Sequence, residues 1–119
     1  MRLSFVIPGK PLPQKRPIVR RAGWTIDPPE SVKEKRRIAT IALMEMAKQR
    51  WAMTDQPVKV SLTFHGANKL CDIDNLVKLC LDAVKGVVWK DDRQVQQLFA
   101  IKRDSTKVSA RTCFRISEQ

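Results

Sequence analysis

The chain has 119 residues and carries 23 Lys or Arg against 12 Asp or Glu, which gives a formal net charge of +11. That length fits one domain, which we expect to span residues 1–119, and no apolar run approaches the roughly 18 residues of a membrane span. The three cysteines form no Cys-x-x-Cys pair, and their odd number argues against a disulfide framework, so we expect a cytoplasmic protein.

The first half of the chain predicts a strand, a loop and a helix. Apolar and polar residues alternate over 2–8, which is typical of a strand with one buried face. Prolines crowd residues 9–29 and exclude a helix or a central strand, so we expect a loop there. Helical spacing of apolar residues over 30–51 predicts a helix with a core face of Ala39, Ala42, Leu43, Met46 and Ala47.

The second half predicts a strand over 57–65, a helix over 74–86 and two strands over 94–103 and 108–116. The helix has an apolar stripe formed by Leu76, Cys80, Ala83, Val84 and Val87. Residues 104–107 are few enough to join the last two strands as a hairpin. The resulting order, β-α-β-α-β-β, predicts a two-layer α+β domain with a small mixed sheet and two helices.

The basic residues are concentrated near the start of the chain. Residues 1–50 carry 12 basic and 4 acidic residues, a net of +8, which is the charge pattern of a nucleic-acid binder. A merely solvated basic loop is the alternative. Of the tryptophans, Trp51 and Trp89 are expected in the core, whereas Trp24 could stack on a base. The cations of this loop are expected to lie apart from acidic residues and to contact phosphate. They are Lys10, Lys15, Arg16, Arg20 and Arg21.

The acidic residues are gathered in a different window. Five of the twelve fall between residues 72 and 92, and all five are aspartates: Asp72, Asp74, Asp82, Asp91 and Asp92. Asp72 and Asp74 lie at a helix start, where the helix dipole favours ionised carboxylates. Mg²⁺ takes one or two carboxylates together with water and phosphate oxygens. Lys78, one turn after Asp74, would place an ammonium group beside such a metal.

A less specific interpretation of these residues stays open. Asp72 or Asp74 could simply cap the helix, and Lys78 could form surface ion pairs with Asp74 and Asp82, worth a few tenths of a kcal/mol. The combination of several aspartates with a strongly basic chain favours a metal that bridges protein carboxylates and a nucleic-acid phosphate.

Two longer motifs carry a resemblance that covers nearly the whole chain. They are the run Asp72-Ile73-Asp74-Asn75-Leu76-Val77-Lys78, followed by Asp82, Gly86 and Trp89-Lys90-Asp91-Asp92, and the run Gly9-Lys10-Pro11-Leu12-Pro13-Gln14-Lys15-Arg16-Pro17. With this spacing the chain resembles the RusA family of Holliday junction resolvases. The resemblance implies a homodimeric, Mg²⁺-dependent endonuclease that binds four-way DNA junctions and nicks two strands symmetrically in recombination and repair.

The resemblance also implies roles for individual residues. Asp72, Asp74 and Asp92 match the family's metal-binding catalytic aspartates, and Lys78 matches its catalytic lysine. Some members carry several arginines before the first aspartate, where this chain has only Lys69. We therefore expect Lys69 to contact DNA and the loop from Lys10 to Arg21 to carry more of the binding.

These observations lead to one main hypothesis and two alternatives. We expect a bacterial or phage-encoded junction endonuclease that is associated with the nucleoid and has no small-molecule substrate. A nuclease acting on flaps, forks or RNA is the first alternative. The second is a non-catalytic basic nucleic-acid-binding protein.

Overall fold

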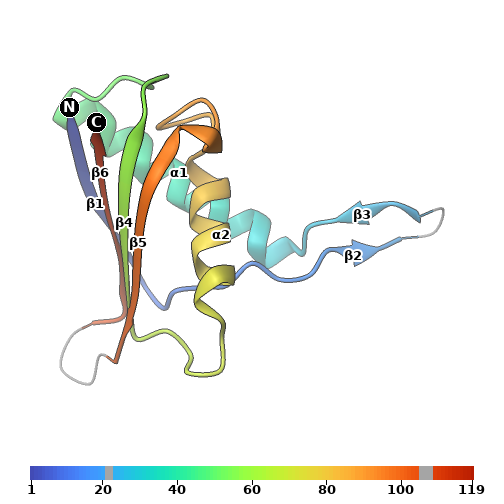
Figure 1. The fold of residues 1–119 in the computed structure, drawn as a ribbon. Helices are drawn as coiled ribbons and strands as arrows, with labels where there is room; N and C mark the ends of the chain where they lie inside the picture. The colour runs from blue at the N-terminus through green and yellow to red at the C-terminus, as the bar shows by residue number, and fades with distance from the viewer. Residues whose placement is uncertain (21–22, 105–108) are drawn as a thin grey trace.

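A computed structural model describes residues 1–20, 23–104 and 109–119 of the chain. It contains a four-stranded mixed sheet with both long helices on one of its sides (Figure 1). In their order across the sheet, the strands are β1 (Arg2–Pro8), β6 (Arg111–Glu118), β4 (Val58–His65) and β5 (Val95–Arg103). The helices are α1 (Pro29–Gln49) and α2 (Ile73–Val84). The predicted α+β class, with a mixed sheet and two helices, is confirmed.

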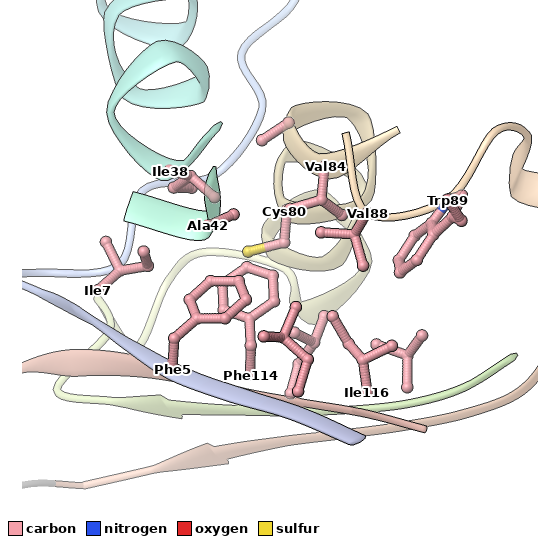
Figure 2. Close-up of a cluster of buried hydrophobic side chains, with 14 of the residues drawn as sticks. Phe5, Ile7, Ile38, Ala42, Cys80, Val84, Val88, Trp89, Phe114 and Ile116 are labelled. Carbon is pink, nitrogen blue, oxygen red and sulfur yellow. The ribbon is translucent and has the colours of Figure 1, made fainter. Parts of the chain in front are cut away.

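The core lies between the sheet and the helices. Alternation buries every second residue of β1 and β4, as the sequence predicts. Phe5 and Phe114 come from paired positions of β1 and β6, and their rings stack with centroids 4.5 Å apart. Figure 2 shows both rings rising from the sheet toward Ala42 of α1 and Cys80 of α2. The inner face of the sheet is therefore buried against the helices, and the alternate residues of the strands point to the opposite face.

The predicted hairpin between the last two strands is wrong. β4 lies between β5 and β6, so these two strands are not neighbours in the sheet. β5 instead pairs with β4 in parallel, because α2 connects them as a crossover helix and returns the chain in the same direction. β6 buries Thr112, Phe114 and Ile116 and occupies a central position, whereas β5 buries no residue fully and forms an edge. Residues 105–107 of the predicted turn, and Val108, lie outside the described residues.

Helix α1 also buries a different face from the predicted one. Ala42 and Met46 are buried as expected, but Leu43 is 55% exposed. Ala39 is half-buried and Ala47 is exposed. The buried face runs through Ser31, Glu34, Ile38, Ala42 and Met46. It includes a charged residue because the carboxylate of Glu34 receives hydrogen bonds from Arg37 at 2.7 and 3.1 Å.

The proline-rich segment is more ordered than a loop. It contains a two-stranded antiparallel ribbon, β2 (Ile18–Val19) with β3 (Thr25–Ile26), which projects away from the rest of the fold (Figure 1). Prolines lie outside both short strands, so the ribbon can form without joining the main sheet. We call residues 9–28 the basic arm. Among the described helices, none is both long and apolar enough to cross a membrane.

Candidate active site

One hollow beside α2 brings together most of the residues predicted to carry chemistry. Asp74, Lys78, Asp82 and Asp92 all line this hollow, which has a volume of about 550 Å³. We call it the acidic hollow. Its apolar lining comes from the exposed side of α2 and from the edge strand β5, namely Ile73, Val77, Leu81, Leu98 and Ala100. The fold therefore places three carboxylates and one ammonium group on the same open surface.

Asp72 lies at the start of α2 but does not line the acidic hollow. It occupies the N-cap position with extended backbone angles, φ −74° and ψ 138°. Its side chain makes no capping hydrogen bond, although this is the position at which an aspartate usually makes one. The capping interpretation thus does not account for the carboxylate of Asp72, which is exposed and free to bind something else.

Asp74 and Lys78 are exposed on neighbouring turns of α2. The Oδ1 atom of Asp74 accepts a hydrogen bond from the backbone N–H of Asn75 at 3.1 Å. Within the described residues, no carboxylate lies within 4.0 Å of the Lys78 ammonium, so the surface ion pairs considered from sequence do not form. By the same measure, no cation pairs with Asp72, Asp74 or Asp92, although the chain carries a net charge of +11.

A side chain of the hydrophobic core fixes the position of Asp92. Its Oδ1 atom accepts a hydrogen bond of 3.0 Å from the indole Nε1 of Trp89, whose side chain is fully buried. The short helix η2 (Asp92–Gln94) begins at this residue and leads directly into β5. The anchored Asp92 can still offer its second carboxylate oxygen to the acidic hollow.

The other two aspartates of the cluster have structural partners. Asp91 caps η2: its Oδ1 atom accepts from the backbone N–H of Arg93 at 3.0 Å, and its own backbone N–H donates to Oε1 of Gln94 at 2.8 Å. The bond from the Arg93 backbone lowers the pKa of Asp91. Asp82 lies 3.8 Å from the ammonium of Lys35 on α1. Asp82 and Asp91 thus each lie within 4.0 Å of a cation, whereas among the described residues Asp72, Asp74 and Asp92 do not.

The donor set suits a hard divalent cation. Among the described parts of the chain, no three His, Cys, Asp or Glu side chains are close enough together to form a ready metal cluster. Asp74 and Asp92 nevertheless line one hollow with free carboxylate oxygens, and Mg²⁺ needs only one or two carboxylates when water and phosphate supply the rest. Asp74 and Asp92 therefore have the donor chemistry that such an ion needs, whereas Asp72 does not line the hollow but directly precedes Ile73, which does.

The basic arm starts against the same helix. The backbone N–H of Gln14 donates to the carbonyl oxygen of Asn75 at 2.9 Å, next to Asp74. Lys35 adds a second attachment, because its ammonium lies 2.9 Å from Asp27 at the far end of the arm and also faces Asp82. A hollow of about 350 Å³ lies between the arm and α2, and Lys78 lines it as well as the acidic hollow.

The predicted DNA-contacting cations have different surroundings. Lys10, Arg16 and Arg20 are exposed on the arm, and Lys69 is exposed in the loop before α2. Lys15 forms an ion pair of 2.7 Å with Glu30, so the expectation that the arm cations lie apart from acidic residues is wrong for this one. Arg21 lies outside the described residues. Trp24 is 73% exposed on the arm, whereas Trp51 and Trp89 are in the core, as predicted.

Three residues that support the site were missed from sequence. Gln14 and Lys35 attach the arm, and Lys102 of β5 donates from its ammonium to the carbonyl oxygen of Cys71 at 2.6 Å, just before Asp72. The contacts of Gln14 with Asn75, of Lys102 with Cys71 and of Lys35 with Asp82 join segments that are distant along the chain, so no local spacing predicts them. The parallel pairing of β4 and β5 could have been inferred, because a helix connects the two strands.

Comparison with known proteins gives one family. A sequence model of that family, described as endodeoxyribonuclease RusA, matches residues 8–116 of the 119-residue chain. The match includes the basic arm, α2 with its aspartates and the whole of β5. No curated protein matches the chain.

Proposed function

Because this chain belongs to the RusA endodeoxyribonuclease family, we propose that it is an enzyme that resolves Holliday junctions by paired nicking of two DNA strands. One structural observation supports the proposal in addition to the family match. Asp74, Asp92 and Lys78 line one open hollow, and none of them has an ion-pair partner among the described residues. These three are available to a substrate.

The carboxylates and the lysine have complementary tasks in this proposal. Asp74 and Asp92, with Asp72 at the margin, would hold Mg²⁺, which when bound activates water and stabilises the leaving oxygen. Trp89 holds Asp92 in place through the indole hydrogen bond. Lys78 lies between the two hollows, where its ammonium would neutralise charge that develops on the phosphate during cleavage.

The basic arm would bind the DNA backbone next to the cleaved bond. Lys10, Arg16 and Arg20 are exposed and carry no ion pair within the described ranges, so phosphate is a suitable partner for them. We assign Arg21 and Lys69 to the same task. Lys15 would contribute less, because Glu30 already compensates its charge.

Symmetric nicking requires two equivalent sites. A single chain offers one acidic hollow with Asp74, Lys78 and Asp92. A two-fold homodimer would present two such hollows to a four-way junction, which shares the same symmetry. We therefore propose that the active form is a homodimer and that it acts on nucleoid DNA in the cytoplasm.

Cleavage assays on synthetic substrates test the proposal. We expect a four-way junction to be nicked in two opposed strands when Mg²⁺ is present and to remain intact in EDTA. Flaps, forks and branched RNA of matched length serve as competing substrates. A gel shift of the junction without cleavage, in Mg²⁺ or Mn²⁺, would favour a non-catalytic binding protein. Faster cleavage of flaps or forks would reassign the substrate within branched nucleic acids.

A further inference from the structure

The sheet has a second face that none of the described helices or strands covers. Figure 1 shows α1 and α2 together on one side of the strands, and the core fills only that side. We call the opposite side the outer face. Five cations lie on it or at its ends: Arg2, Lys59, Arg103, Arg111 and Arg115.

Strand alternation directs these cations outward. In β4, Lys59 stands between the buried Val58 and Val60, and in β6, Arg115 stands between the buried Phe114 and Ile116. Lys59 and Arg115 are close in the sheet, because Ser61 pairs directly with Arg115 and both cations line the same two hollows. The fold thus separates an apolar inner face from a basic outer one.

The cations of the outer face lack carboxylate partners. None of the five lies within 4.0 Å of an Asp or Glu among the described residues. The two hollows on this face, of about 600 and 450 Å³, are lined by no acidic residue. On the helix side, by contrast, Lys35 and Arg37 are each paired with a carboxylate. Like charges gathered without counter-charges favour an anionic partner.

His65 lies in the same positive electrostatic environment. It pairs with Arg111 on one side and Arg103 on the other in the sheet. Partial burial lowers its pKa first, and the charges of Arg111 and Arg103 lower it further. The surroundings of His65 therefore favour its neutral imidazole, as expected beside cations that have no compensating carboxylate.

The outer face also carries groups that suit a nucleic-acid backbone. Phe99 of β5 is 56% exposed, and the ammonium of Lys59 lies 5.3 Å from the centre of its ring. Ser61 and Thr63 supply hydroxyl groups to the larger hollow. Cations, hydroxyl groups and an exposed aromatic ring are the side chains that contact DNA phosphates and bases.

The edge strand β5 connects this face to the acidic hollow. Leu98 and Ala100 line the acidic hollow, whereas Phe99 and Ile101, on the other side of the same strand, line the larger outer hollow. A polynucleotide that passes over β5 would therefore run from one surface to the other. We propose that the outer face is a second DNA-binding surface, which holds the phosphate backbone of a junction arm away from the nicked bond. This inference rests on the proposed function for the identity of its ligand.

A charge-removing variant tests the inference. The outer-face variant is Lys59→Gln with Arg115→Gln, and the matched control is Lys48→Gln with Arg50→Gln, which removes the same charge at the end of α1. Junction affinity is measured by titration across salt in EDTA, so that cleavage does not interfere. We expect the outer-face variant to lose about tenfold in affinity near physiological salt and to reduce the salt slope by about 0.9 per lost phosphate contact. We expect the control to lose less than twofold.

The length of the junction arms provides a second readout. With arms too short to pass over β5, unmodified protein and outer-face variant should bind equally, whereas long arms should separate them. Equal affinity and equal salt slope on long-armed junctions would overturn the inference, as would identical losses in the control variant. Failure of the proposed function has a different signature, because the unmodified protein would then leave every branched DNA uncut in Mg²⁺ while these titrations remain measurable.

Discussion

The indole Nε1 of Trp89 donates a hydrogen bond of 3.0 Å to Oδ1 of Asp92, and this bond joins the hydrophobic core to the acidic hollow. Trp89 is fully buried, so the carboxylate is oriented by a side chain that cannot move without disturbing the core. Among the described residues, by contrast, the carboxylate of Asp74 receives a hydrogen bond only from its neighbour Asn75 on α2. These two carboxylates of the acidic hollow are therefore fixed by different parts of the fold.

The first prediction concerns this bond. Trp89→Phe keeps an aromatic ring in the core but removes the indole donor, so Asp92 should lose its orientation. We expect the Mg²⁺ concentration for half-maximal cleavage to rise severalfold and the free energy of unfolding to fall by roughly 1–3 kcal/mol. Trp51→Phe is the matched control, because the Nε1 of Trp51 donates to the carbonyl oxygen of Val88 at 3.1 Å and touches no carboxylate. An equal Mg²⁺ shift in both variants would show that Trp89 acts through stability alone.

The second prediction concerns the unpaired carboxylates. Asp72→Asn, Asp74→Asn and Asp92→Asn each keep the side-chain shape and remove a negative charge, so cleavage should fall by two or more orders of magnitude, on the order of the loss seen for a principal catalytic group. Junction affinity should stay the same or increase, because a charge that repels phosphate is gone. Asp55→Asn, at an exposed position elsewhere, is the control. Wild-type cleavage rates in all three variants would remove these residues from the site.

The third prediction separates chemistry from binding. Lys78→Ala should lower the single-turnover cleavage rate of bound junction and change affinity only modestly, because its ammonium acts where the phosphate becomes more negative. Arg16→Gln with Arg20→Gln should instead weaken binding and flatten its salt dependence, by a slope of about 0.9 for each lost contact. Lys15 is left unchanged, since Glu30 pairs with it. If Lys78→Ala loses only affinity and the arm variant loses only rate, the assigned roles are reversed.

The fourth prediction concerns assembly. Analytical ultracentrifugation at micromolar concentration should show the free protein as a species of twice the 13.6 kDa chain mass, and the complex with a four-way junction should contain two chains for each junction. A monomer under both conditions would contradict paired nicking by a two-fold dimer. A dimer that forms only on the junction would support it, because the substrate itself has the required symmetry.

The fifth prediction concerns alkaline pH. Burial raises the pKa of the Cys80 thiol, and the nearby charge of Glu34 raises it further, so folding favours the neutral thiol. This stabilisation is complete below the pKa of the unfolded thiol, about 8.5, and is lost as pH rises toward the folded value. Urea unfolding should therefore show stability falling above pH 9, by up to about 1.4 kcal/mol per unit from this group. Cys80→Ala should be less stable at neutral pH but lose less between pH 9 and 10.5. Identical pH slopes would exclude the thiol as the cause.

Sequence patterns predicted the parts of the fold that depend on local spacing. Alternation placed Leu3, Phe5 and Ile7 in the core, and the same rule was correct for β4. Alternation assigns a residue to a face but not a strand to a neighbour, so the order β1-β6-β4-β5 was not available from it. On α1, the buried Glu34 shows a similar limit, because its place in the core depends on Arg37 rather than on hydrophobicity.

The candidate site was predictable as a list of residues but not as an arrangement. The clustering of aspartates around α2 is visible in the sequence, and Asp74, Lys78 and Asp92 do line one hollow. Nothing in the spacing separates these residues from Asp82 or Asp91, whose partners come from α1 and from η2. The outer-face cations were individually visible, but their common surface depends on the pairing of four strands.

The bond between the Gln14 N–H and the Asn75 carbonyl has a consequence for how this protein can diverge. Both partners are backbone atoms, so every residue type except proline preserves the bond at position 14. The side chains of the arm can therefore change to suit DNA of another shape or sequence without detaching the arm from the helix that carries Asp74 and Lys78. Under the proposed function, substrate preference and catalytic geometry would therefore be separately adjustable in this fold.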